Sequence, residues 1–129
     1  MSVIRSSARV LALTALFATP AAFAADATAG KAVFEKYACI ACHTTTADGP
    51  AMPGPSLAGV VGRKAGSVKD FAMYSAALKE YGVTWNAKTL DEFLANPMGK
   101  VPGTAMVIPV SDAKERADLI GYLATLKGK

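Results

Sequence analysis

The sequence predicts an all-α protein in which four helices are joined by long loops rich in glycine and proline. Four segments place apolar residues three or four positions apart, as the buried face of a helix requires. No segment alternates apolar and polar residues in the manner of a half-buried strand. The stretch 44–70 contains three prolines and five glycines, which interrupt regular structure.

A separate N-terminal segment precedes these helices. It begins MSVIRSSAR, with two arginines and no acid, and continues as an apolar run that ends in the small-residue sequence AFA at Ala24. This layout is typical of a secretory signal peptide cleaved after Ala24 or Ala25. The apolar run stops near Pro20, short of the ~20 residues that a membrane anchor needs. We therefore expect residues 1–24 to be removed and residues 25–129 to form one periplasmic domain.

Cleavage changes the charge balance of the protein. Arg5 and Arg9 leave with the signal peptide, so that 12 basic and 10 acidic side chains remain. The sequence has no basic cluster or RNA-binding motif, which argues against a nucleic-acid partner. A mildly positive surface would at most steer an acidic protein partner.

The first two predicted helices flank the long loop. The first covers residues 28–38 with Thr28 as its N-cap, and its apolar face holds Val33, Phe34 and Tyr37. The second covers residues 73–81 and ends at Gly82, a common C-terminal stop.

The other two predicted helices follow Trp85. The third begins at Asn86 or Ala87 and ends before Pro97. The last begins at Asp112, which has capping-box spacing to Glu115. Helical spacing of apolar residues supports both, through Leu90, Phe93 and Leu94 in the third and Leu119, Ile120, Leu123 and Leu126 in the last.

The length of the loop 44–70 needs an explanation. A domain of this size buries a modest fraction of its surface, so its helices alone provide a thin core. Structureless loops of this length in compact domains are usually functional. We infer that the loop wraps an apolar group other than protein.

The segment CIACH contains both cysteines, Cys39 and Cys42, and the single histidine, His43. A redox dithiol of the thioredoxin type needs a βαβ context, which is absent from the pattern. A structural zinc site needs four ligands, and only these three are present. C-x-x-C-H is the attachment signature of c-type haem, in which both thiols bond to the haem and the histidine binds iron. The motif therefore favours haem.

The opposite face of the haem needs another ligand, and because no other histidine exists the choices are methionine, lysine or an open position. Met52, Met73, Met98 and Met106 remain once the signal peptide is removed. Met73 begins a predicted helix, where core packing is its expected use. Met106 lies in the loop KVPGTAMVIP, where Pro102 and Gly103 define the turn and Thr104 can anchor it. Such a constrained loop makes Met106 the favoured ligand.

Nearly all of residues 25–129 resembles a class I c-type cytochrome, the small soluble type of bacteria and mitochondria. The resemblance rests on the segments GKAVF, CIACH, GPSLAGVVGRKAG, YSAAL, GVTW, LANP, VPGTAM and ERADLIGYL. It implies the cytochrome c fold, wrapped around one covalently bound haem c. It also implies that Gly30, Phe34, Gly121 and Tyr122 lie where the first and last helices cross.

The resemblance assigns roles around the haem. Cys39 and Cys42 would carry it, with His43 and Met106 as iron ligands. The Pro55 carbonyl would accept a hydrogen bond from the other imidazole nitrogen of His43. Gly49–Pro50 is a similar pair, but only Gly54–Pro55 is followed by the expected Leu57.

Four further residues resemble those that surround a haem propionate in this family. A partly buried carboxylate needs hydrogen-bond donors, and these side chains supply them. The residues are Arg63, Tyr74, Trp85 and Thr104.

One departure from the family concerns the exposed haem edge. Met98, Gly99 and Ala105 stand where the mitochondrial type has lysines. Lys64, Lys79 and Lys100 would supply a weaker basic surface.

The resemblance implies an electron-transfer protein rather than an enzyme. We expect a monomeric one-electron carrier. Its electron donor would be a quinol-oxidising complex (quinol–cytochrome c oxidoreductase) or a dehydrogenase, and its acceptor a terminal oxidase or reductase. It would dock only transiently on membrane complexes. An alternative is a dedicated electron-accepting subunit of a periplasmic dehydrogenase of the sulfite or alcohol type. A haem peroxidase or gas sensor is a third hypothesis, and it would require an open iron position.

Overall fold

A computed structural model describes residues 24–128 of the chain. It contains helices α1 (Ala27–Lys36), α2 (Ala76–Tyr81), α3 (Ala87–Ala95), α4 (Pro97–Lys100) and α5 (Ala113–Thr125), and a 3₁₀ turn η1 (Cys39–Ala41). No β-strand occurs among the described residues, where an isolated bridge joins Lys64 to Thr84. The all-α prediction is confirmed. The predicted signal peptide lies outside the described residues except for Ala24.

Helix α1 begins earlier than predicted. Its N-cap is Asp26, whose carboxylate accepts hydrogen bonds from the backbone N–H groups of Thr28 and Ala29. The prediction of Thr28 as N-cap was wrong, because Asp26 also suits a cap and stands one turn before the first buried residue, Gly30. The helix ends at Lys36, and Ala38 adopts a left-handed backbone with φ 52° that leads into η1.

Helix α2 begins later than predicted. Ser75 caps it by accepting a hydrogen bond from the N–H of Leu78, and Gly82 ends it with φ 49°. Met73 therefore precedes the helix, and its side chain is 63% exposed. The expectation that Met73 packs in the core was wrong.

Helices α3 and α4 follow each other directly. Asn86 and Thr89 form a complete capping box at the start of α3. Pro97 ends α3 as predicted but also opens the short α4, because proline suits the first turn of a helix.

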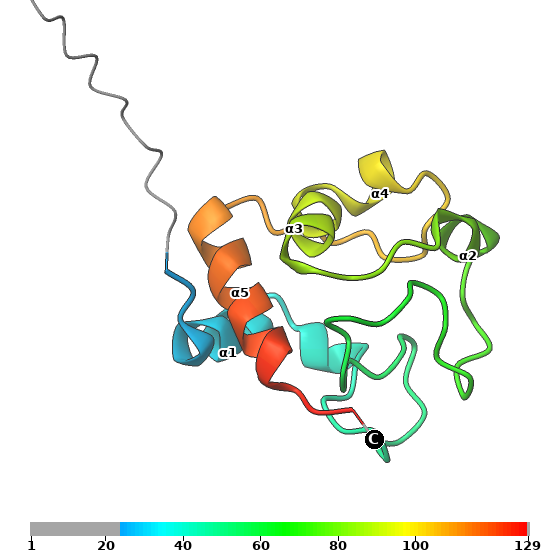
Figure 1. The fold of residues 1–129 in the computed structure, drawn as a ribbon, viewed down its shortest axis with the longest axis horizontal. Coiled ribbons are helices and arrows are strands. Elements are labelled where there is room, and N and C mark those ends of the chain that lie inside the picture. The colour runs from blue at the N-terminus through cyan, green and yellow to red at the C-terminus, as the bar shows by residue number, and fades with distance from the viewer. Residues whose placement is uncertain (1–23, 129) are drawn as a thin grey trace, which may run out of the picture.

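Helix α5 crosses α1, and the two lie side by side in Figure 1. Gly30 allows the close approach, since a Cβ there would lie 1.9 Å from the backbone oxygen of Asp118. The rings of Phe34 and Tyr122 meet edge to face, with centroids 5.6 Å apart. Gly121 instead faces Ala25, which precedes α1. A Cβ added at residue 121 would lie 2.9 Å from the Cβ of Ala25.

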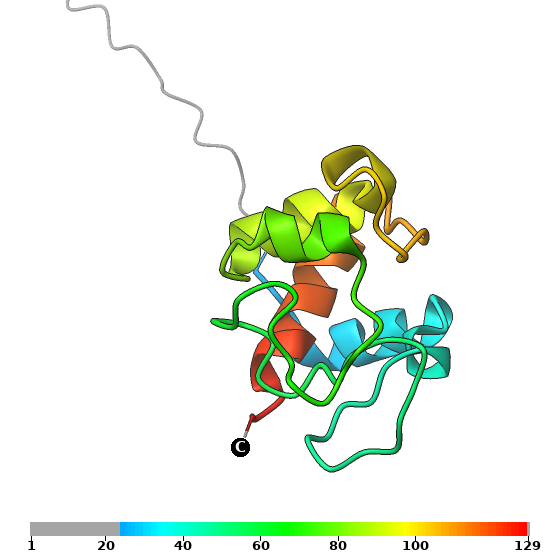
Figure 2. The same ribbon diagram turned by 90° about the vertical axis from the view of Figure 1, so that its right-hand side faces the viewer.

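The long loop predicted over residues 44–70 extends to Ser75 and completes the wall that the helices leave open. Figures 1 and 2 show it running from η1 to α2 beside the crossed pair α1 and α5. Buried residues from α1, α3 and α5 form the core and face this loop across a cavity. Among residues 24–128, none of the helices has the length and apolar content that crossing a bilayer requires.

Candidate functional site

A cavity of about 300 Å³ lies between the core and the long loop. All nine residues predicted for the site line this one cavity, although they come from η1, two loops and the turn before α3. These residues are Cys39, Cys42, His43, Pro55, Arg63, Tyr74, Trp85, Thr104 and Met106.

His43 is held by the long loop. Its Nδ1 lies 2.8 Å from the carbonyl oxygen of Pro55. A carbonyl only accepts, so Nδ1 carries the proton and Nε2 keeps its lone pair. Burial lowers the pKa of His43; the Pro55 hydrogen bond opposes this effect and the charge of Arg63 adds to it. The imidazole is therefore neutral at pH 7, the form that binds metals.

Gly54 explains why this loop can approach the imidazole. A Cβ at residue 54 would lie 2.5 Å from Cε1 and 2.7 Å from Nδ1 of His43. The backbone of Gly54 also donates to the carbonyl of Cys42 at 2.7 Å, and Leu57 donates to Thr44 at 2.9 Å. These contacts align residues 54–57 with residues 42–44. The partner of His43 is thus Pro55, as predicted, and not Pro50.

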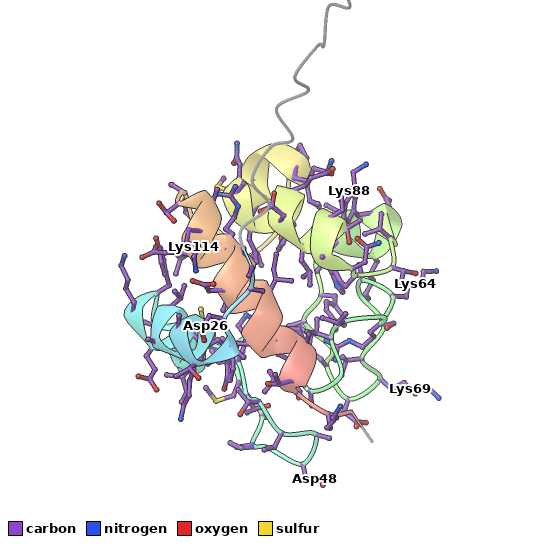
Figure 3. The ribbon with its side chains drawn as sticks, turned by 60° about the vertical axis from the view of Figure 1, so that its left-hand side comes forward. Asp26, Asp48, Lys64, Lys69, Lys88 and Lys114 are labelled. Carbon is purple, nitrogen blue, oxygen red and sulfur yellow. The ribbon has the colours of Figure 1, made fainter. Side chains whose placement is uncertain are left out.

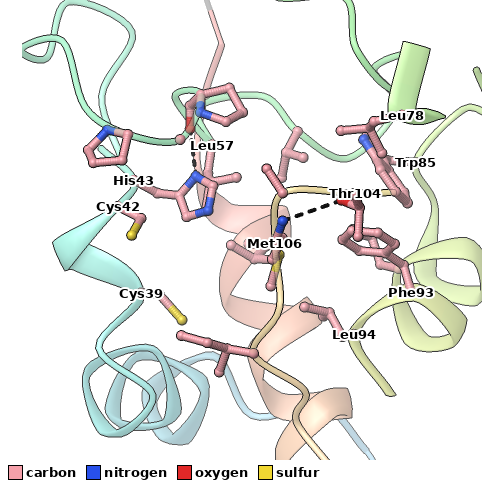
Figure 4. A pocket seen from close by; sticks show the side chains of 18 of the residues that line it. Cys39, Cys42, His43, Leu57, Leu78, Trp85, Phe93, Leu94, Thr104 and Met106 are labelled. Carbon is pink, nitrogen blue, oxygen red and sulfur yellow. Dashed lines mark hydrogen bonds between the residues drawn. The ribbon is translucent and has the colours of Figure 1, made fainter. Parts of the chain in front are cut away.

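The η1 turn presents the two cysteines. The carbonyl of Cys39 accepts hydrogen bonds from the N–H groups of Cys42 and His43, at 3.1 and 2.9 Å. Both thiols are free; Cys42 is exposed, whereas Cys39 is half-buried and burial raises its pKa. Figure 4 shows both sulfur atoms on the same side of the cavity as His43.

Met106 enters from the opposite wall. Its backbone N–H donates to Oγ1 of the buried Thr104 at 3.4 Å, which anchors the loop as expected (Figure 4). Met73 also lines the cavity, at its exposed margin, whereas Met52 and Met98 do not line it. Of the four candidate methionines, Met106 is therefore the half-buried one that faces the cavity.

Because the imidazole of His43 is neutral, Arg63 is the one charged side chain among the described cavity residues. Its guanidinium donates to the backbone oxygens of Ser56 and Ala58, each at 2.9 Å. Burial lowers the pKa of Arg63, although the group stays charged. It holds a positive charge in the cavity wall and cross-links the loop that carries Pro55.

Two aromatic residues complete the predicted set. The Tyr74 hydroxyl accepts a hydrogen bond from the N–H of Val68 at 3.3 Å, and burial raises the pKa of this phenol. Trp85 is buried against Phe93, with ring centroids 5.1 Å apart.

Some cavity residues were not predicted. Tyr37 lines the cavity and donates from its hydroxyl to Glu115 at 2.8 Å, which ties the cavity wall to α5. Leu78 lies one turn after Tyr74, a spacing that could have revealed it. Phe71 lies in a loop without periodicity, so the sequence offers no signal for it.

The donor set decides what the cavity can hold. Two free thiols, a neutral imidazole and a thioether suit iron in a covalently attached haem, and most of the other lining residues are apolar. Among residues 24–128, no three His, Cys, Asp or Glu side chains are grouped to hold a metal ion, so a zinc site receives no support there.

Comparison with known proteins gives one consistent result. The family model described as cytochrome c matches residues 27–127. A cytochrome c of Tetrahymena pyriformis is 49% identical over 102 residues, covering 78% of this chain and 89% of that protein. A cytochrome c homolog of Bradyrhizobium diazoefficiens is 46% identical over 89 residues, which cover 68% of this chain and 48% of that protein. The structure of cytochrome cH from Methylobacterium extorquens is similar with a TM-score of 0.69 and 48% identity, covering 78% of this chain and 98% of that one.

Proposed function

We propose that this chain, which belongs to the cytochrome c family, uses His43 and Met106 as the two axial ligands of its haem iron. Proteins of this family carry covalently bound haem c and are electron-transfer proteins rather than enzymes, so the chain is a monohaem electron carrier. One observation supports the ligand assignment above all. The neutral imidazole of His43 and the side chain of Met106 come from opposite walls of the same cavity.

The residues present fit this cofactor. Cys39 and Cys42 would form the two thioether bonds, because both are free thiols at the cavity. Arg63, Tyr74, Trp85 and Thr104 would lie around the haem propionates. When bound, the haem iron stores one electron by alternating between Fe(II) and Fe(III).

The chain's own side chains would set the electronic properties of the site. The hydrogen bond from His43 to Pro55 makes the imidazole a stronger donor. The soft sulfur of Met106 favours the reduced metal. The apolar walls exclude water and lower the local dielectric constant. If His43 and Met106 both bind the iron, they would leave no position for oxygen or peroxide.

Replacing Met106 tests the ligand assignment. In the haem-loaded protein, Met106→Ala should abolish the visible band associated with sulfur–Fe(III) bonding and should let the reduced protein bind carbon monoxide rapidly. Met98→Ala is the matched control, because Met98 is 55% exposed and lies outside the cavity. Survival of the band in Met106→Ala would show that another residue is the ligand. Rapid carbon monoxide binding by the unmodified protein would favour the peroxidase or gas-sensor hypothesis.

The cellular role is a further part of the proposal. We place the protein in the periplasm after removal of the signal peptide, as a carrier between a quinol-oxidising complex or dehydrogenase and a terminal oxidase or reductase. The N-terminal pattern of residues 1–24 supports export. Sequencing the N-terminus of the coloured periplasmic protein tests it: a start at Ala25 or Asp26 is expected, and an intact residue 1 would contradict it.

A dedicated subunit of one periplasmic dehydrogenase is the second candidate. The weakly basic surface favours it, because a free carrier that serves several partners gains from charge steering. Copurification with a dehydrogenase at a fixed ratio would support this candidate. A freely diffusing monomer that reduces several partners would contradict it.

A further inference from the structure

The part of the cavity that meets solvent is uncharged. Seven of the residues that line the cavity are themselves exposed, and none carries a charge. They are Ala38, Cys42, Pro53, Met73, Ala105, Val107 and Ile108. This is the edge at which a bound haem would come closest to the surface.

Three large apolar side chains, those of Met73, Val107 and Ile108, lie on this edge. A fourth, Ile40, is exposed beside Cys39 but does not itself line the cavity. Ile40 and Met73 are each 63% exposed, Val107 is 57% exposed and Ile108 is 47% exposed. We call these four residues the apolar rim. Ile40 lies between the two cysteines in η1, while Val107 and Ile108 directly follow Met106. Figure 2 shows η1 and the loop before α5 on the same side of the molecule. Residues of both segments line the cavity.

Two lysines that precede rim segments in the sequence are held in ion pairs. Lys36, just before η1, forms an ion pair with Glu115. Lys100, which was expected to add to a basic surface, forms an ion pair with Glu92. The charges of Lys36 and Lys100 are therefore largely compensated by these two glutamates.

Other lysines lie away from the cavity lining. Figure 3 shows Lys64, Lys69 and Lys88 projecting into solvent from α3 and from the loop before α2. None of them lines the cavity, and neither does Lys79. Arg63 does line it, but its guanidinium is bonded to carbonyls of the cavity wall.

We propose that the apolar rim is the docking surface for a redox partner protein that presents an uncharged, apolar patch over its own redox centre. The proposal rests on the proposed electron-carrier function, because electron transfer requires the partner to cover the edge where the haem comes closest to solvent. A charged partner surface would lose hydration on this rim without gaining an opposite charge. An apolar partner surface loses nothing, and both surfaces gain by leaving water.

The number of rim residues indicates a small, transient contact. Electron-transfer complexes occupy the low end of interface sizes, which permits rapid dissociation. Because apolar burial does not depend on ionic strength, association should be nearly insensitive to salt. This distinguishes the proposal from docking through a ring of lysines, which weakens steeply as salt is added.

Electrodes coated with defined monolayers provide the probe. The haem-loaded protein should exchange electrons at least about tenfold faster with a methyl-terminated alkanethiol monolayer than with a carboxylate-terminated one, because only the former matches the rim. The rate at the methyl surface should change less than about twofold between about 10 mM and about 500 mM salt. Preference for the carboxylate surface, or a steep fall with salt, would overturn the proposal.

Matched variants locate the contact. Met73→Glu and Ile108→Glu place a charge on two separate segments of the rim, and each should slow exchange at the methyl surface by about tenfold, since that charge must be desolvated. Val61→Glu is the control, because Val61 is also exposed, at 39%, but does not line the cavity. Equal effects of all three variants would overturn the assignment. The midpoint potential of each variant in solution shows whether the haem itself is disturbed.

Two further results separate the possible failures. If the dissolved protein shows no reversible one-electron titration, the proposed electron-carrier function fails, and the docking proposal fails with it. If it titrates normally but sediments as a dimer that Met73→Glu dissociates, a second copy covers the rim and the docking proposal alone is overturned. A monomer that titrates normally, with the variant pattern above, supports both.

Discussion

Replacing Gly54 with alanine provides a direct test of how the chain positions His43. The added Cβ would lie 2.5 Å from Cε1 and 2.7 Å from Nδ1 of the imidazole, and 2.8 Å from the carbonyl oxygen of Cys42. Ordinary contacts of this kind begin near 3.4 Å. The ring or the loop must therefore move by roughly 1 Å, which is enough to break the 2.8 Å hydrogen bond to Pro55.

The expected cost has two parts. Forcing an extra methyl group into a packed site costs about 1–3 kcal/mol. Loss of the hydrogen bond adds about 1 kcal/mol. We expect Gly54→Ala to lower the free energy of unfolding of the haem-loaded protein by roughly 2–4 kcal/mol. The midpoint potential should rise, because an imidazole without its carbonyl partner is a weaker donor and stabilises Fe(III) less.

Guanidinium unfolding followed by circular dichroism, together with a spectroelectrochemical titration, measures both effects. Gly49→Ala is the matched control: it alters the other Gly–Pro pair, where the three atoms nearest to the new Cβ belong to the Thr44 side chain and not to His43. The control should keep the potential of the unmodified protein. If Gly54→Ala matches Gly49→Ala in both stability and potential, the role of Gly54 in positioning His43 is refuted.

Two further predictions concern the crossing of α1 and α5. Gly30→Ala should destabilise the protein by about 1–3 kcal/mol, because the new Cβ would meet the Asp118 backbone. Gly121→Ala should destabilise it less, because its Cβ would meet the Ala25 methyl group. Denaturant unfolding of both variants measures the two losses, and equal losses would contradict the prediction. The second prediction concerns Asp118, whose carboxylate accepts hydrogen bonds from Lys114 and from the backbone N–H of Asp26. These bonds hold the pKa of Asp118 below its ordinary value. The charged carboxylate therefore stabilises the folded protein above about pH 4, and this stabilisation is lost as the pH falls through the lowered pKa. Asp118→Asn should therefore reduce stability at pH 7 but not at pH 2, and equal losses at both would contradict it.

Several features could be predicted from the sequence because they depend on neighbouring residues. The CIACH segment carries its own chemistry, and the capping residues Asn86 and Asp112 lie within one turn of the N–H groups that they bind. The start of α1 was mispredicted because Asp26 and Thr28 are both good caps, and only the position of the buried face decides between them. Helix α4 was missed because Pro97 indicates both an end and a beginning.

The candidate site could be predicted in content but not in arrangement. The sequence predicts Met73 at the start of a helix and Met106 in a constrained loop, whereas in the structure Met73 precedes the helix, exposed at the cavity margin, and Met106 faces the cavity. The resemblance to known cytochromes identified Pro55 as the partner of His43. The physical reason, the absence of a Cβ at Gly54, became visible only with the atoms in place.

The sequence by itself determined the cofactor-binding chemistry and the existence of α1, α2, α3 and α5, because thiols, imidazole and helical periodicity act over a few residues. Tertiary structure decided which side chains meet at the cavity and which charges remain at its edge. Glu115 neutralises Lys36 from 79 residues away in the chain, so the apolar character of the rim is a property of packing. Electrostatic and steric contacts depend on distance in space, which local sequence does not contain.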